Sequence, residues 1–522
     1  MSFRQRRSGS QEAILLMPAA AGSAGMGVVA AQAPLVGAGA GALTILTLMP
    51  WRLLFVLMTG AAILNRFRFD VAGVTLQPAH LILVPVLLRV LLFMRSDARP
   101  RWRWPETVIV LFIAVQFTSS YLFAEVRLRS LLVAGLLLLG VLAYLAVYFG
   151  VCDRRRLIFA ARALLIAAMA NSAIALLAVA AYYTVGSTFG VSVGGIGAPA
   201  AGLAAEYNIL GSMSASAALA FVVLMREDNP LFPRRYSLLG FWLCTGALVA
   251  SLTRGAWIAF AVGLLASLLI RRRATRRNRL AQIGLTSLAL GVGVLGLFQI
   301  AVAPSDVSSP DNAVVVRAQR LLLFSEGSGQ NRVSEWQTAL REVPKSPILG
   351  LGTNSYGQRH AAPKKRPSEA KGAYIGNLYI RTLYDSGVVG LVLLLTFLVA
   401  VLWPKRIFRV SRGDIAPVAW ALMFMYFTMG VAFVATDASF QLWPWIVLGM
   451  TRAARSLTVR QDSMGRALPA TDGDRAGNGH RGGGNGHRGG SGNGKLLEAL
   501  KQDAGAEQPW PGSRSGLRHD GF

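Results

Sequence analysis

The chain has 522 residues, of which 53% are hydrophobic and only 15% are charged. Apolar blocks long enough to cross a bilayer recur along it, which excludes an ordinary soluble domain. The blocks lack alternating polar residues, and backbone amides in hydrocarbon must be paired internally, so the pattern indicates helices and not a barrel. The net charge of +28 lies mostly in short loops between apolar runs, where it orients helices and meets anionic headgroups, so membrane lipids and no nucleic acid are expected as partners.

The predicted class is all-α, a polytopic membrane protein with about 12–14 transmembrane helices, counted by apolar length. Residues 1–26 begin with basic side chains and continue with small apolar ones, which favours an uncleaved N-terminal segment. The expected spans are 27–48, 51–65, 79–94, 107–123, 130–150, 158–183, 206–225, 238–252, 255–270, 281–303, 379–402, 416–435 and 440–451.

Basic residues predict which helix ends face the cytoplasm. The turn near Arg254, the segment 184–205 and the long connection 304–378 then fall together on the outer side. The residues assigned to the cytoplasmic side are Arg154 to Arg156, the run from Arg271 to Arg279, Lys405, Arg406, Arg409, Arg452 and Arg455.

Five regions follow from this order: an N-terminal segment at 1–26, membrane helices at 27–303, and an extracytoplasmic connection with short helices at 304–378. Further membrane helices occupy 379–455, and a Gly-rich basic tail at 456–522 is too poor in large apolar residues to bury a core, which predicts cytoplasmic disorder. Within the connection, Asn331 to Glu342 has amphipathic spacing, with Val333, Trp336 and Leu340 on one side.

Three polar segments interrupt the apolar background on the predicted outer side. They are Ser251 to Trp257 with Arg254, Asn331 to Tyr356 with Arg332 and Trp336, and Tyr374 to Gly390 with Asn377, Tyr379, Arg381 and Asp385. Each has a purely structural interpretation: an arginine at a helix end, an amphipathic helix entering a Pro/Gly turn, and a polar re-entry turn.

Taken in order, these segments resemble the O-antigen ligase and Wzy-type polymerase superfamily, over about residues 25–455. The resemblance implies a GT-C-like helical bundle and inverting, metal-independent glycosyl transfer. The matching residues are Arg254, Arg332 with Trp336, Pro347 with Gly350 and Gly352, Asn377, Asp385, and Gly387 with Gly390, together with a helix entry at Glu206, Tyr207 and Asn208.

The chain departs from this family at Gly376, where the ligases have a histidine implicated in activating the acceptor hydroxyl. Three possibilities follow: another group acts as the base, the acceptor needs little activation, or the chain is a non-catalytic relative. The candidate bases are His360, Glu206, Glu369 and Asp385.

The remaining residues suit a diphosphate leaving group. Catalysis then mainly needs positive charge against the departing diphosphate, and arginine supplies it with two parallel hydrogen bonds. We predict that Arg254 and Arg332 form this clamp, with His360 and Asp385 as the other catalytic candidates. No metal or other cofactor is expected. The predicted substrate-binding residues are Glu206, Asn208, Trp336, Asn377, Tyr379 and Arg381.

The leading hypothesis is a glycosyltransferase of the bacterial cytoplasmic membrane whose active site faces outwards. It would use a polyprenyl-diphosphate-linked oligosaccharide as donor and either a growing glycan (polymerase) or a lipid or protein (ligase) as acceptor. Loss of the ligase histidine favours the polymerase. The alternative is a transporter or flippase of lipid-linked saccharides, which internal repeats and ionisable residues deep in the membrane would indicate.

Overall fold

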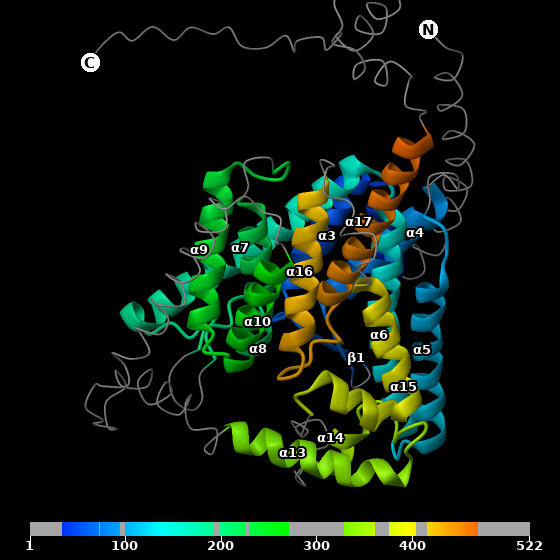
Figure 1. Ribbon diagram of the computed structural model, residues 1–522. Coiled ribbons are helices and arrows are strands. Elements are labelled where there is room, and N and C mark those ends of the chain that lie inside the picture. Colours follow the sequence, from blue (N-terminus) through cyan, green and yellow to red (C-terminus); the bar gives the residue numbers. More distant parts are fainter. Residues whose placement is uncertain are drawn as a thin grey trace, which may run out of the picture. The chain divides into compact units, whose positions relative to one another are not determined.

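The computed structural model describes residues 34–71, 74–93, 100–192, 199–225, 229–270, 328–360, 375–402 and 415–467. These residues are mostly helical (Figure 1). The helices are α2 Pro34–Leu48, α3 Trp51–Ile63, α4 Pro78–Phe93, α5 Trp104–Phe123, α6 Arg127–Gly150, α7 Arg154–Val185, α8 Tyr207–Leu224, α9 Arg234–Ala250, α10 Arg254–Ile270, α13 Ser328–Glu342, the 3-10 turn η3 Val343–Lys345, α14 Ser355–His360, α15 Leu378–Leu402, α16 Ala416–Ala432 and α17 Leu442–Ala467.

The apolar runs do form helices, and the all-α polytopic class is confirmed. Every predicted span coincides with a helix except 281–303, which lies outside the described residues, as do residues 1–33 and the tail after 467. By length and composition, five described helices can each cross a membrane, and the bent pair Gly41–Leu48 and Trp51–Ile63 gives a sixth if it is one span. The count of 12–14 spans stays a prediction.

Helix α8 forms the centre of the bundle, in contact with α9, α10 and α16. Its 18-residue apolar window is 94% buried within the protein, so little of it is left to face lipid. Small residues permit this close packing. A Cβ on Gly211 would lie 2.7 Å from the Oγ of Ser251, and a Cβ on Gly240 of α9 would lie 2.5 Å from the ring of Phe221.

A buried ion pair joins α5 to α17. Glu106 is fully buried, and its carboxylate accepts hydrogen bonds from Arg452 at 2.8 Å and from the hydroxyl of Tyr144 in α6 at 2.9 Å. Arg452, which we predicted to lie on the cytoplasmic side, is only 5% exposed and is paired inside the bundle. Such a pair is costly to break, since either partner alone would be a buried charge.

Helix α15 is broken at Gly387, whose φ of +65° lies in the left-handed region. The break leaves amides at the start of the second half without helical partners. Carbonyl groups of the long connection 304–378 accept them: Pro347 from Val388 at 2.9 Å and Ile348 from Val389 at 3.2 Å.

The same turn also caps the first half of α15. The amides of Leu351 and Gly352 donate to the carbonyls of Tyr384 and Asp385, at 2.8 and 3.0 Å. Gly350, with φ of +75°, lies so close that a Cβ there would overlap the backbone of α15. The predicted Pro/Gly turn at Pro347 to Gly352 and the predicted helix start at Gly387 and Gly390 therefore form one hydrogen-bonded unit.

The long connection 304–378 contains short helices as predicted, but the buried side of α13 differs from the predicted one. In α13, Trp336 packs inwards with Ala339, whereas Val333 and Leu340 are 47% and 45% exposed. Val343 follows four residues after Ala339, so the buried residues form a helical stripe next to the predicted one.

A short hairpin follows α3. Strand β1 (Phe69–Val71) pairs antiparallel with β2 (Val74–Leu76), with Phe69 opposite Leu76. The sequence analysis did not predict it, because strands of three residues lie below the length at which alternation is visible.

Candidate active site

The predicted outer segments meet at one loop, residues 433–441 between α16 and α17, which we call the connecting loop. The amide of Leu378 donates to the carbonyl of Phe433 at 3.0 Å, and the guanidinium of Arg332 donates to the carbonyl of Ala435. Gly255, next to Arg254, packs so closely that a Cβ there would overlap that of Ala435. The starts of α10, α13 and α15 therefore converge on the same few residues.

The turn that carries Arg254 is also fixed to α8. The hydroxyl of Thr253 donates to the carbonyl of Tyr207 at 3.2 Å, and Leu252 takes a left-handed φ of 52°. Glu206, the N-cap residue of α8, precedes Tyr207 directly. The helix entry at Glu206 and the turn at Arg254 thus lie at one end of the bundle, as predicted, together with the external connection. We call this end the connection end.

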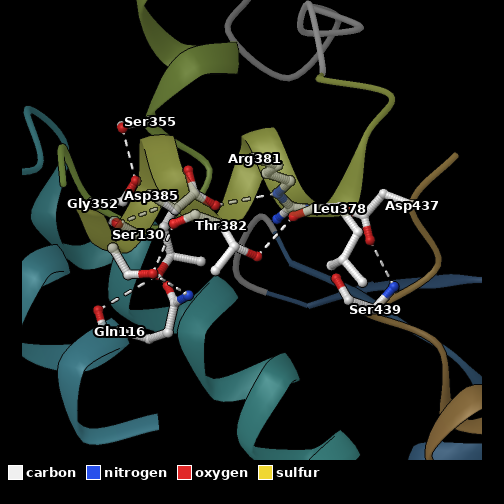
Figure 2. A network of polar contacts seen from close by, with 12 residues as sticks. Gln116, Ser130, Gly352, Ser355, Leu378, Arg381, Thr382, Asp385, Asp437 and Ser439 are labelled. Carbon is white, nitrogen blue, oxygen red and sulfur yellow. Dashed lines mark hydrogen bonds and ion pairs between the residues drawn. The ribbon is translucent and has the colours of Figure 1, made fainter. Parts of the chain in front are cut away.

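Arg381 is the central charge at the connection end, with 8% of its surface exposed (Figure 2). Its Nε donates to Asp385 at 3.2 Å, one helical turn away, and Nη1 pairs with Asp437 of the connecting loop. The ring of Phe440 lies 3.9 Å from the guanidinium carbon. Asp437 is oriented in turn by the amide of Ser439 at 2.8 Å. A buried arginine between two carboxylates is held in one orientation.

Arg381 opens onto a cavity of about 300 Å³, which we call the polar cavity. Three arginines and two carboxylates contribute to it, and amides and a hydroxyl complete the polar part. The lining residues are Arg68, Thr75, Gln77, Arg129, Val133, Leu136, Glu206, Ile209, Asn354, Arg381, Asp437, Ala438, Phe440 and Gln441.

On its other side, Arg381 borders a narrow slot of about 40 Å³, the apolar slot. Tyr379, Asp385 and Gln116 contribute polar groups near Arg381, and leucines, phenylalanines and methionine make up much of the rest. Arg381 lines both the apolar slot and the polar cavity, so its side chain lies at the boundary between these two spaces.

The predicted clamp residues lie beside the polar cavity but do not line it. The guanidinium of Arg332 donates to the carbonyl of Ala435. Arg254 directly precedes Gly255, which packs against the same Ala435. Ala435 is two positions from Asp437, which is at most about 7 Å along the chain. Arg254, Arg332 and Arg381 therefore surround one loop, although the arginines that line the cavity are Arg381, Arg68 and Arg129.

The predicted binding residues at the start of α8 differ in environment. Glu206 is exposed and lines the polar cavity, whereas Asn208 is buried within α8 and is absent from the cavity lining that the structure describes. Of these two residues, only Glu206 is positioned to contact a ligand in the cavity.

His360 and Trp336 belong to a packed cluster between α13, α14 and α15. His360 lies 3.2 Å from the carboxylate of Glu342 and against the ring of Tyr356, and Tyr384 donates to the same carboxylate at 2.5 Å. Burial raises the pKa of Glu342, but the hydrogen bonds, led by that from Tyr384, lower it to about 2. This arrangement ties His360 to the connection and leaves it outside the described lining of the polar cavity.

Asn377 and Tyr379 both make structural contacts. The side-chain oxygen of Asn377 accepts the amides of Tyr379 at 2.9 Å and of Ile380 at 3.1 Å, so it caps α15. The hydroxyl of Tyr379 donates to the carbonyl of Gly430 in α16 at 2.7 Å, while its ring lines the apolar slot. Gly376, at the position of the ligase histidine, directly precedes this cap.

Three charged residues of the site were missed in the sequence. Arg68 follows α3, Arg129 lies in the first turn of α6, and Asp437 lies in the connecting loop. Arg68 and Arg129 each lie among other charged residues between apolar runs, and all three look like ordinary loop or helix-end residues. Of the three, only Asp437 could have been noticed in the sequence. It is an acidic residue between the predicted spans 416–435 and 440–451, and ionisable residues at such positions are often functional.

The charged groups of the described residues include no set of three or more His, Cys, Asp or Glu side chains arranged to hold a metal ion. The groups of the polar cavity that can bind an anionic ligand are the guanidinium groups of its three arginines.

Comparison with protein families gives one match: residues 239–395 fit the model of a family described as O-antigen ligase. This confirms the resemblance to the O-antigen ligase and polymerase superfamily and implies membrane glycosyl transfer in glycan assembly. The matched part contains Arg254, Arg332, Arg381 and Asp385, whereas Glu206 precedes it. A search of curated proteins gave no match.

Proposed function

We propose that this chain, which matches the O-antigen ligase family over residues 239–395, transfers a glycan from a polyprenyl-diphosphate-linked oligosaccharide to an acceptor hydroxyl. The observation that carries the proposal is the position of Arg381 between the apolar slot and the polar cavity. A donor of this kind has an apolar chain, a diphosphate and a sugar in that order. It needs a cation at the boundary between an apolar and a polar space.

In this proposal, Arg381, Arg68 and Arg129 bind the diphosphate inside the polar cavity. Arg254 and Arg332 add positive charge from the other side of the connecting loop. The charge stabilises the leaving group as it departs. Asp385 and Asp437 position Arg381 by fixing two sides of its guanidinium.

Glu206 is the base that fits this geometry. Its carboxylate lines the same cavity as Arg381, and an acceptor hydroxyl bound there can donate its proton to it. The acceptor oxygen then forms a bond to the anomeric carbon, the bond from that carbon to the diphosphate oxygen breaks, and the electron pair leaves with the diphosphate. Attack opposite the leaving group inverts the anomeric configuration.

The choice of acceptor depends on Gly376, which stands where the ligases have a histidine. Without the ligase histidine, we assign a growing glycan as acceptor, which makes the chain a polymerase, with a lipid or protein acceptor as the ligase alternative. The connection end faces outwards from the bacterial cytoplasmic membrane, because Arg154, Arg155 and Arg156 lie at the opposite end of α6.

Two arginines in the first turn of α6 supply a matched test. Arg129 lines the polar cavity, whereas Arg127 is also exposed but contacts the ring of Tyr121 instead. We expect Arg129→Gln to lower kcat/KM for the lipid-linked donor by about 10²-fold and Arg127→Gln to leave it unchanged. The assay uses the full chain in vesicles with donor and glycan acceptor. Equal effects of the two variants would contradict the clamp, and donor movement across the membrane without transfer would identify a transporter.

A further inference from the structure

A second charged cavity, of about 650 Å³, lies at the end of α6 opposite the polar cavity; we call it the basic cavity. Helix α6 runs from Arg127 at the connection end to Gly150, which packs against Trp51, and its 24 residues span about 36 Å. The basic cavity is therefore separate from the proposed active site. It is lined by Pro50, Trp51, Arg52, Arg89, Asp153, Arg154, Arg155 and Arg156.

Positive charge reaches the basic cavity from three separate places in the chain. Arg52 comes from α3, Arg89 from α4, and Arg154 to Arg156 from the start of α7. The structure describes every lining residue, and among them Asp153 is the one carboxylate. That carboxylate caps α7 by accepting the amide of Arg156 at 2.8 Å and also pairs with its side chain at 3.2 Å. The cavity is thus strongly cationic.

The arginines are held in place by their surroundings. Arg89 donates to the carbonyls of Thr47 and Leu48 at 3.2 and 3.1 Å, and its guanidinium lies 4.7 Å from the ring of Phe93. Arg52 lies 5.7 Å from the ring of Phe159. Loop charges that only orient helices need no such fixed positions.

Backbone donors add to the charge. Helix α3 begins at Trp51 after Pro50 and has no side-chain cap, so its first amides, which belong to residues that line the cavity, have no helical partners. Trp51 is 8% exposed, and its ring packs against Gly150 at the wall of the cavity.

We propose that the basic cavity binds a phosphate group, either free or as the headgroup of an anionic lipid. Arginine forks and helix N-termini are the donors that proteins use for phosphate. Leu53, one residue after Arg52, and Leu91, two residues after Arg89, expose 47% and 64% of their surfaces, which provides apolar area for acyl chains. The site does not depend on the glycosyl transfer proposed above.

The test compares two double variants of the full chain. Arg52→Gln with Arg155→Gln removes two charges from the basic cavity. Arg234→Gln with Arg235→Gln removes two exposed arginines at the start of α9, which also follows a proline N-cap. Binding of phosphatidylglycerol and phosphatidylcholine is measured by native mass spectrometry in detergent. Binding of inorganic phosphate is measured as a rise in melting temperature over chloride at equal ionic strength.

We expect the cavity variant to bind phosphatidylglycerol about 25-fold more weakly and the α9 variant to be unchanged. If phosphate alone stabilises the wild type and displaces the lipid, the source is free phosphate; if it does neither, the source is the lipid. Equal weakening in both double variants, or in neither, would overturn the proposal. Should the cavity variant not fold, the single variant Arg155→Gln, which removes one exposed arginine from the lining, must weaken binding of whichever probe the wild type binds.

Discussion

At the scale of single residues, the account depends on Arg381 and its two carboxylates. The guanidinium is buried, pairs with Asp385 and Asp437, and borders both the apolar slot and the polar cavity. A buried charge is stable only with its partners, so the loss of one member leaves the others uncompensated.

Replacement of Arg381 by methionine keeps most of the side-chain volume and removes the charge. Because Asp385 and Asp437 would then be buried without their cation, we expect Arg381→Met to lower the free energy of unfolding by about 3–5 kcal/mol. Chemical denaturation in detergent measures it, with Arg235→Met on the surface of α9 as the control. A variant as stable as the wild type would show that the network does not hold the loop.

The choice of base is testable with isosteric changes. Glu206→Gln keeps the shape and removes the proton acceptor, so we expect it to lower kcat by about 10²–10⁴-fold and leave the KM for donor nearly unchanged. His360→Gln should leave kcat unchanged, since His360 is tied to Glu342 away from the cavity lining. Single-turnover rates at saturating donor decide between them, and a reversed order of effects would make His360 the base.

At the scale of elements, the turn at residues 347–352 is joined by backbone hydrogen bonds to α15 at the break in this helix. Carbonyl and amide groups of the turn satisfy both halves of the broken helix, and this fixes the first half, which carries Arg381 and Asp385. The position of the site therefore depends on backbone contacts at Gly350 and Gly387.

Gly350→Ala tests this dependence. The new Cβ would overlap the backbone of α15 at a left-handed φ, so we expect a loss of more than about 2 kcal/mol in unfolding free energy. Gly135→Ala in α6 is the control, because a Cβ there meets nothing within 4 Å and a helical alanine should stabilise slightly. Thermal unfolding measures the stability of both variants. A Gly350→Ala variant as stable as Gly135→Ala, or more stable, would show that the position of α15 does not depend on the contact at Gly350.

At the scale of the whole molecule, α6 separates two cationic spaces at its opposite ends, the polar cavity and the basic cavity. If the connection end faces outwards, each space meets a different side of the membrane. The arginines of the basic cavity then obey the positive-inside rule, and those of the polar cavity need a functional explanation.

Cysteine labelling in cells tests this orientation. In a background with Cys152 and Cys244 replaced by serine, we expect a membrane-impermeant maleimide to label Arg127→Cys from outside. Arg155→Cys should react only after the membrane is permeabilised. Both positions are exposed: Arg127 begins α6, and Arg155 lies in the first turn of α7, just past the other end of α6. The reverse pattern would place the proposed active site in the cytoplasm.

The sequence predicted the helices and the convergence of the polar segments well, because apolar length and Pro/Gly punctuation are local signals. It did not predict the polar cavity. Arg68, Arg129 and Asp437 lie far apart in the chain and come together only when α6, the hairpin region and the connecting loop pack. It also did not predict the buried pair of Arg452 and Glu106, since the two residues lie in helices far apart in the chain.

The central claim is that the diphosphate of the donor binds at Arg381, between the two spaces. The most direct measurement is an electron cryomicroscopy structure of the full chain with polyprenyl diphosphate. The predicted result is diphosphate density within hydrogen-bonding distance of Arg381 and Arg129, with the first isoprene units in the apolar slot. Diphosphate density elsewhere, with the polar cavity empty, would contradict the account.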